Sequence, residues 1–179
     1  FFYRSKRDSG SDKTYNVANR VLFELGSEGL NQSQPLSEAW IAFIEFLNCK
    51  EYNQALSDRL EIDLSHCHLE ITLKQYSQHD YISSHTDRSW VSATHLFFLN
   101  SHWNKSWGGI LQFLTDDQAA FFSIPPVFQQ SVAFVRSDSS WHEVTPIVHP
   151  TEKRLALQVA FWNTLERFVL PGRETNLMD

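Results

Sequence analysis

Cysteine, basic clusters and long apolar runs are all scarce in this chain. Its only two cysteines, Cys49 and Cys67, are too few for a disulfide framework, so we expect a reducing, cytoplasmic setting. No apolar run approaches the roughly 20 residues that span a bilayer, and no secretory leader is evident, so no membrane association is expected. The formal net charge of −6, without any basic run, disfavours a nucleic-acid-binding module. The sequence opens on Phe1 without an initiator methionine, and we expect residues to precede it.

Aromatic residues, by contrast, are abundant, with 14 Phe and 6 Trp. Such an excess suits either a β-rich core or an aromatic-lined cavity, and composition does not separate the two. The 179 residues include 42% hydrophobic and 20% charged residues, which is typical of a globular protein and not of a disordered one. We therefore expect one domain over residues 1–179, large enough to bury a single core.

The first sixty residues have the pattern of helices. Between Tyr15 and Leu25, the apolar residues Val17, Val21 and Leu22 recur at helical spacing, which predicts a first helix. A second helix is predicted from Ser37 to Leu47, where a broad apolar stripe follows a serine suited to cap a helix N-terminus. Residues 1–60 are therefore expected to be helical.

Beyond residue 62, short β-like segments alternate with turn-forming residues. The predicted strands are Leu69–Tyr76, Ser92–Leu99, Ile110–Leu114, Ala120–Ile124, Ser131–Val135 and Arg154–Trp162. Helices followed by many short strands predict a mainly β fold with supporting helices, namely an antiparallel sandwich or jelly roll. The jelly-roll core is expected at about residues 62–165, packed by the N-terminal helices.

A candidate metal site arises from two histidines and a carboxylate. In an extended segment, positions i and i+2 point to the same side, so His85 and Asp87 can bind one ion together. His142, which follows an apolar run and a polar turn, is a candidate third ligand from a remote strand. Two imidazoles and one carboxylate suit Fe(II) and leave coordination positions open. The alternative is a surface His–Asp pair and an unrelated turn histidine.

Arg154 favours the metal site over that alternative. In the predicted strand from Arg154 to Trp162, alternation places a polar or small residue at every second position on one face, including Arg154 and Gln158, and apolar residues on the other. An arginine that faces a cavity is costly unless it meets an anion, and a dicarboxylate cosubstrate would provide one. A simple solvated edge strand is the alternative.

Several independently spaced elements resemble a known family. They are His85-Thr86-Asp87, Leu96 to Asn100, Trp103, Trp107 to Leu111, Pro126, Phe128, Trp141 to Val144 and Arg154 to Gln158. In this order they look like the 2-oxoglutarate- and iron(II)-dependent dioxygenases of the prolyl-4-hydroxylase-like branch. The resemblance covers about residues 70–162 and implies a double-stranded β-helix, which is the jelly roll expected above.

The resemblance implies roles for individual residues. His85, Asp87 and His142 fall on the metal ligands of the family, and Arg154 falls on its residue for the distal carboxylate of 2-oxoglutarate. Tyr76 matches a tyrosine that contacts the cosubstrate. Phe98 stands where close relatives place a second cosubstrate-binding tyrosine, so Thr94 or Gln158 are candidate helpers.

The implied activity is hydroxylation of an unactivated C–H bond, with succinate and CO2 as coproducts. It requires Fe(II), 2-oxoglutarate and O2, with ascorbate as a candidate accessory reductant. Prolyl residues in a protein or peptide are the first substrate candidates, and a small molecule is the second. Two other functions stay open: a cupin-like metalloenzyme that works without 2-oxoglutarate, and a jelly-roll binding module without catalysis. The sequence predicts no oligomeric state.

For three further features we expect ordinary structural roles. His66 and His68 lie on one face of a short segment, but no third ligand is near in sequence, so a solvated or packed pair is favoured over a second metal site. His95 is expected to be a core histidine with a hydrogen-bond partner. Gly108 and Gly109 are expected to serve a turn or bulge with demanding backbone angles.

Overall fold

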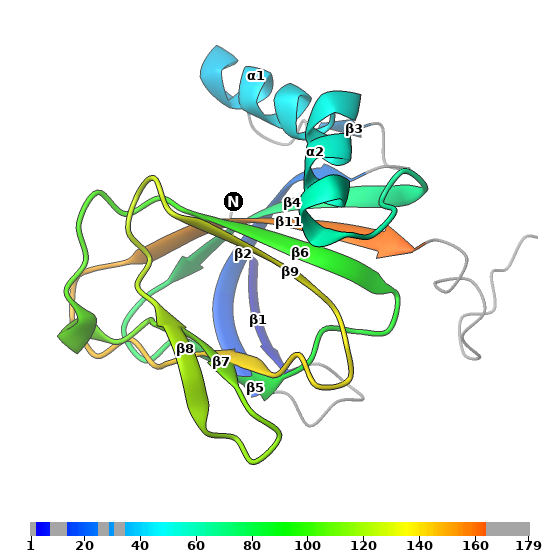
Figure 1. Ribbon diagram of the computed structural model, residues 1–179. Coiled ribbons are helices and arrows are strands. Elements are labelled where there is room, and N and C mark those ends of the chain that lie inside the picture. The colour runs from blue at the N-terminus through cyan, green and yellow to red at the C-terminus, as the bar shows by residue number, and fades with distance from the viewer. Residues whose placement is uncertain (1–2, 8–13, 25–28, 31–34, 164–179) are drawn as a thin grey trace, which may run out of the picture.

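The computed structural model describes residues 3–7, 14–24, 29–30 and 35–163 of the chain (Figure 1). In chain order the elements are β1 (Tyr3–Arg7), β2 (Thr14–Glu24), β3 (Gly29–Leu30), α1 (Glu38–Leu47), α2 (Lys50–Leu60), β4 (Cys67–Tyr76), β5 (Tyr81–His85), β6 (Val91–Phe98), a 3-10 turn (Lys105–Trp107), β7 (Leu111–Leu114), β8 (Ala120–Ile124), β9 (Ser131–Val135), β10 (His142–Val144) and β11 (Arg154–Asn163).

The strands form one curled antiparallel sheet that folds over itself. Neighbouring strands follow the order β8-β7-β10-β5-β2-β4-β11-β6-β9, with β1 and β3 pairing with β2 outside this path. Strand β2 joins the two halves, because it pairs with β4 over most of its length and with β5 through Tyr15 and Asn16. The major half is β2-β4-β11-β6-β9 and the minor half is β5-β10-β7-β8, so the predicted jelly roll is confirmed.

Helices α1 and α2 cover the outer face of the major half (Figure 1). Ser37 caps α1 by accepting a hydrogen bond from the backbone N–H of Trp40 at 3.4 Å, as the serine at this position predicted. Leu47 and Tyr52 from the helices pack against Ile71 of β4 and Leu157 of β11, all of them buried. This packing is the first of two hydrophobic cores.

The second core lies between the two halves of the sheet. Leu96, Phe98 and Ala156 of the major half meet Leu111 and Val144 of the minor half. Along β11 the predicted alternation is confirmed, because Leu157, Val159 and Phe161 belong to the helix-covered core, whereas Arg154 and Gln158 line the interior of the jelly roll. Strand β11 therefore holds a cation inside the fold while its apolar face anchors the helices.

The predicted helix from Tyr15 to Leu25 is wrong, because this segment is strand β2; Leu25 itself lies outside the described residues. Apolar residues at positions 17, 21 and 22 fit a helix, but a short apolar segment fits a strand equally well. The β-branched Val17 and Val21 favour extended backbone, and pairing with both β4 and β5 decides the outcome. The expectation that residues 1–60 are helical therefore holds only from residue 38.

All six predicted strands are present, each with ends within two residues of the prediction. Two short strands that carry the candidate ligands, β5 and β10, were not predicted, since five and three residues leave little periodicity to detect. Within the part of the chain that the structure describes, no helix is long and apolar enough to cross a membrane.

Candidate metal centre

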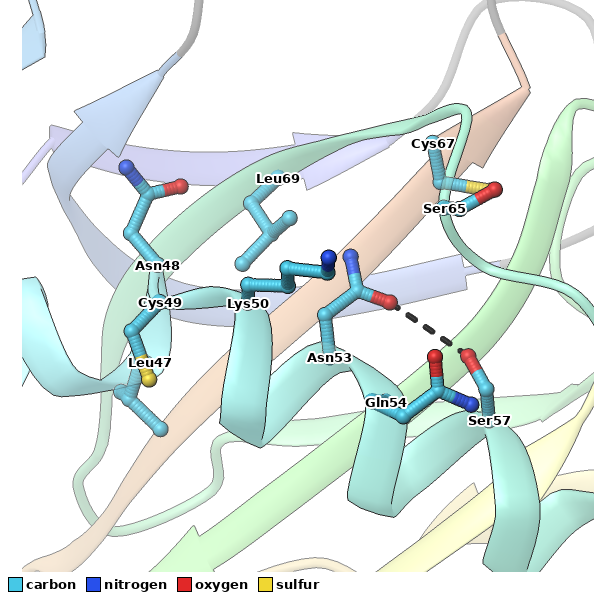
Figure 2. Close-up of a pocket in the computed structure, with 10 residues that line it drawn as sticks. All are labelled: Leu47, Asn48, Cys49, Lys50, Asn53, Gln54, Ser57, Ser65, Cys67 and Leu69. Atoms are coloured by element: carbon cyan, nitrogen blue, oxygen red, sulfur yellow. Dashed lines mark hydrogen bonds between the residues drawn. The ribbon is translucent and has the colours of Figure 1, made fainter.

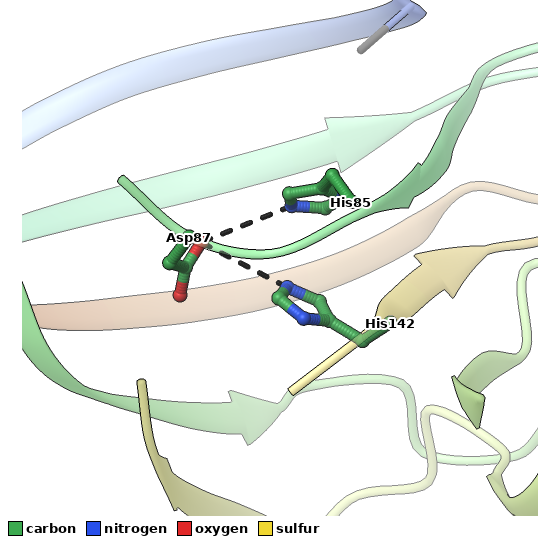
Figure 3. A group of neighbouring side chains, drawn as sticks. All are labelled: His85, Asp87 and His142. Atoms are coloured by element: carbon green, nitrogen blue, oxygen red, sulfur yellow. Dashed lines mark ion pairs between the residues drawn. The ribbon is translucent and has the colours of Figure 1, made fainter. Parts of the chain in front are cut away.

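The side chains of His85, Asp87 and His142 point toward one another (Figure 3). His85 ends β5 and His142 begins β10, and the two residues are direct partners in the antiparallel pair. Their Nε2 atoms each lie 3.8 Å from Oδ1 of Asp87. These separations are too long for hydrogen bonds, yet all three candidate ligand atoms lie within 4.8 Å of one another. The arrangement leaves space for an ion between them.

Backbone carbonyls orient both imidazoles. Nδ1 of His85 lies 2.8 Å from the carbonyl oxygen of Ser83, and Nδ1 of His142 lies 3.0 Å from that of Ser140. A carbonyl oxygen only accepts, so each Nδ1 carries a proton and each ring turns its Nε2, the nitrogen left for a metal, toward Asp87. Metal-binding histidines are commonly held in this way.

Asp87 is held by its side chain and by its backbone. The hydroxyl of Thr94 donates to Oδ2 at 2.8 Å, which leaves Oδ1 turned toward the imidazoles. Nε of Arg136 donates to the Asp87 backbone oxygen at 3.1 Å, and the Arg136 guanidinium also pairs with Asp138 at 2.7 Å. The donor set of two imidazole nitrogens and one carboxylate oxygen fits a divalent transition metal such as Fe(II).

A cavity of about 110 Å³ extends from these three residues into the jelly roll. It contains every site residue that the sequence predicted, because its walls include His85, Asp87, His142, Arg154, Tyr76, Thr94 and Gln158. Apolar residues such as Leu96 and Leu111 complete the walls. Residues from seven strands, spread over more than eighty positions of sequence, thus line one cavity.

Arg154 lies in this cavity with only 1% of its surface exposed. Its Nε donates to the backbone oxygen of Gly109 at 2.9 Å, but Nη2 has no hydrogen-bond partner among the described residues. The guanidinium carbon lies 4.7 Å from the ring centre of Tyr76 and 5.6 Å from that of Phe98. A buried cation with a donor left over is the physical requirement for an anion-binding site.

Burial shifts the pKa values of both Arg154 and Tyr76. Burial lowers the pKa of Arg154 and raises the pKa of Tyr76 to about 12, so the phenol stays protonated at neutral pH. Phe98 packs against the guanidinium but offers no hydroxyl, so Tyr76 provides the phenol on this side of the cavity.

Thr94 lines the cavity and donates its hydroxyl to Asp87. The expectation that it helps to bind a cosubstrate stays a prediction. Other expectations hold: His95 lies on the helix-covered face and is hydrogen-bonded to the hydroxyl of Tyr52 at 2.9 Å. Gly108 and Gly109 have φ values of 75° and 66°, as a demanding turn requires. His66 and His68 are in no metal-like cluster among the described residues.

Three residues near the site, Arg136, Lys74 and Phe134, were not predicted from the sequence. Arg136 holds Asp87 although it merely follows a predicted strand, and no local pattern marks it. Lys74 lines the cavity and donates to Asn19 at 3.1 Å; its alternation with Tyr76 along β4 was the available signal. Phe134 lies with its ring centre 4.9 Å from that of His142.

A second and larger hollow, of about 350 Å³, lies far from these ligands in sequence (Figure 2). It is bounded by α2 and the start of β4, and its walls combine polar side chains such as Asn53 with apolar ones such as Leu47 and Leu69. Asn53 and Ser57 are hydrogen-bonded to each other across 3.4 Å on the helix side. None of the candidate ligands lines it.

Comparison with known proteins agrees with this geometry. Two histidines and one carboxylate in a jelly roll are typical of non-haem iron oxygenases as a class. The model of the 2OG-Fe(II) oxygenase superfamily matches residues 71–162, slightly more than half of the chain. The chain therefore belongs to the 2OG-Fe(II) oxygenase superfamily, and it is a dioxygenase that uses Fe(II), 2-oxoglutarate and O2.

Solved structures share the fold at low sequence identity. A prolyl-4-hydroxylase from Pseudomonas putida superposes with a TM-score of 0.64 at 19% identity, covering 89% of this chain and 77% of that one. A prolyl hydroxylase from Trichoplax adhaerens, in complex with a peptide fragment of the hypoxia inducible factor oxygen degradation domain, gives 0.66 at 16% identity, covering 96% and 74%. No curated protein sequence matches the chain significantly.

Proposed function

We propose that His85, Asp87 and His142 bind the Fe(II) and that Arg154 binds the distal carboxylate of 2-oxoglutarate. The observation that carries this proposal is the buried Arg154, whose unpartnered Nη2 lines the same cavity as the three candidate ligands. A dicarboxylate would place one end at the metal ligands and the other at the guanidinium. It would thereby provide a partner for Nη2 of Arg154, which has none among the described residues.

The residues of the chain have distinct tasks in this proposal. The carbonyls of Ser83 and Ser140 hold the imidazole rings so that Nε2 of each faces the metal position. Thr94 holds one oxygen of Asp87 and thereby presents the other. Leu96 and Leu111 contribute apolar walls to the cavity, and apolar walls help to exclude water from the reacting region.

When bound, Fe(II) and 2-oxoglutarate supply the oxidative chemistry that hydroxylates an unactivated C–H bond and yields succinate and CO2. For the substrate, we propose a prolyl residue in a protein or peptide. Support comes from the shared fold with the P. putida prolyl-4-hydroxylase and with the T. adhaerens prolyl hydroxylase, the latter seen with a peptide.

The direct test is anaerobic addition of Fe(II) and 2-oxoglutarate, followed by visible spectroscopy. We expect the weak charge-transfer band of the iron chelate, and succinate once oxygen is admitted. In Asp87→Ala the band should disappear, whereas the exposed Asp116→Ala serves as a matched control and should keep it. Protein without a band and without succinate would rule out the proposed ligands and cosubstrate site together.

A further inference from the structure

Three phenylalanines, Phe113, Phe122 and Phe134, form an aromatic row that reaches from the metal ligands to the surface. Across the minor half of the sheet, Phe122 of β8 is the direct partner of Phe113 of β7, which is the direct partner of His142 of β10. Direct antiparallel partners point to the same face, so these side chains lie in one line on the inner face of the sheet.

The distances between ring centres agree with this linear arrangement. The ring centre of Phe113 lies 6.3 Å from that of Phe122 and 6.1 Å from that of His142. Phe134, from β9 of the opposite half, approaches Phe113 edge-on at 5.1 Å and lies 4.9 Å from His142. Because Phe134 and His142 also line the cavity, the row continues the cavity wall outward.

The outer end of the row is open. Phe122 is 53% exposed although it points to the inner face of the sheet, and β8 is the last strand of the order, with β7 as its neighbour among the described strands. Phe122 belongs to neither hydrophobic core, whereas Phe113 and Phe134 pack against the second one. The three rings form an apolar surface that continues from the cavity wall, and contiguous exposed apolar surface is typical of interaction sites. Its neighbour Phe121, 67% exposed, points to the opposite face of the same strand.

We propose that the aromatic row is the substrate-binding wall and that it receives an extended peptide with an apolar side chain over Phe122. This inference rests on the proposed function and extends it to the recognition of the substrate. Strands lie about 4.8 Å apart, so Phe122 is about 10 Å from the level of His142, which an extended peptide spans with about three residues. The selected apolar side chain therefore lies about three residues from the hydroxylated one.

A peptide pool tests the assignment. The pool consists of capped seven-residue peptides with a central proline and three randomised positions on each side. It is incubated with wild-type protein loaded with Mn(II) and 2-oxoglutarate, which binds without turnover, and the retained peptides are sequenced. We expect aromatic and large aliphatic residues to be enriched at a position about three from the proline.

Substitutions on the two faces of β8 test which face selects the peptide. Phe122→Ala should abolish the enrichment and weaken binding of the best peptide about threefold to tenfold, the range of one aromatic contact. Phe122→Leu should restore part of the affinity. Phe121→Ala, a substitution of the same type one residue away, should leave selection unchanged. All three variants should keep the charge-transfer band of the Fe(II)–2-oxoglutarate chelate, which shows that they are folded.

The outcomes that overturn the substrate wall differ from those that overturn the proposed function. Retention of the enrichment in Phe122→Ala, or no retained peptides from protein that shows the band, overturns the substrate wall and leaves the proposed function intact. Absence of the band in wild-type protein overturns the proposed function instead. A wild-type dimer in sedimentation that Phe122→Ala dissociates would show that a second copy covers the row, which also overturns the inference.

Discussion

Thr94 donates its hydroxyl to Oδ2 of Asp87 at 2.8 Å, while Oδ1 of the same carboxylate lies 3.8 Å from Nε2 of both His85 and His142. One oxygen is thus held by Thr94, and the other faces the two imidazoles. Since Thr94 is 3% exposed, this bond is largely shielded from solvent. If Asp87 binds the metal as proposed, the hydroxyl acts on it through Asp87 and is a positioning group.

Replacing Thr94 with Val should therefore weaken metal binding without emptying the site. Loss of a hydrogen bond that orients a ligand typically lowers metal affinity about 10- to 100-fold, and we expect Thr94→Val to fall in this range. Thr94→Ser keeps the hydroxyl and should stay close to wild type. Titration of the apoprotein with Mn(II) measures the affinity. Equal affinities for Val and Ser would show that the hydroxyl bond does not position Asp87.

Replacing Arg154 with Met should raise the 2-oxoglutarate requirement while metal affinity stays constant. A charge-assisted contact contributes about 1.5–3 kcal/mol, so the KM for 2-oxoglutarate should rise about tenfold to 100-fold. Arg154→Met removes the hydrogen bond from Nε to Gly109 and also the buried Nη2 donor that has no partner among the described residues, so the two effects on stability oppose each other and the net change should be small. The exposed Arg59→Met is the control. An unchanged KM would instead favour a metalloenzyme that binds no cosubstrate at Arg154.

The sequence predicted the site better than the chain around it. Two-residue alternation along extended backbone predicted that His85 and Asp87 lie together and that Arg154 faces away from the apolar core, and the structure brings all three residues to one cavity. Their binding roles stay predictions. The role of Thr94 could not be predicted, because its distance from Asp87 depends on how β6 packs beside the loop after β5. Arg136 was missed for the same reason, since its partner lies 49 residues away.

The N-terminal part of the fold illustrates a second limit. In β2, positions 17, 21 and 22 satisfy a helical pattern, and only the partners β4 and β5 make the segment a strand. The capped helix α1 was predictable, because Ser37 and the apolar stripe are local signals. Local sequence signals therefore predicted the secondary structure of a helix such as α1, which carries its own cap and apolar stripe. They did not predict β2, whose extended conformation depends on pairing with strands distant in sequence.

Gly109 connects the turn after the 3-10 helix to the cosubstrate end of the cavity. A β-carbon there would overlap the side chain of Ile147 and lie 3.2 Å from Cδ of Arg154, at a φ of 66° that side chains rarely adopt. Gly109→Ala should therefore lower the free energy of unfolding by more than about 1 kcal/mol and displace the guanidinium. We expect a raised KM for 2-oxoglutarate with unchanged Mn(II) affinity. If stability falls but KM does not, the turn and Arg154 are independent.

His95 should make the stability of the fold depend on pH in a region remote from the cavity. Burial between α2 and the major half lowers the pKa of His95 to about 4, and its neutral ring accepts the hydroxyl proton of Tyr52. Between pH 4 and the ordinary value of about 6.5, the unfolded chain binds a proton that the folded chain does not, so acid lowers stability.

The expected loss on going from pH 7.5 to pH 5 is about 2 kcal/mol from this residue alone. Urea unfolding at both pH values measures it, with the double variant Tyr52→Phe/His95→Phe as comparison, because removing both partners leaves no buried hydroxyl without a bond. The double variant should show a smaller drop between the two pH values than wild type, whereas the exposed His66→Ala should keep the full drop. Equal drops in wild type and double variant would place the acid sensitivity elsewhere and leave the Tyr52–His95 contact as packing alone.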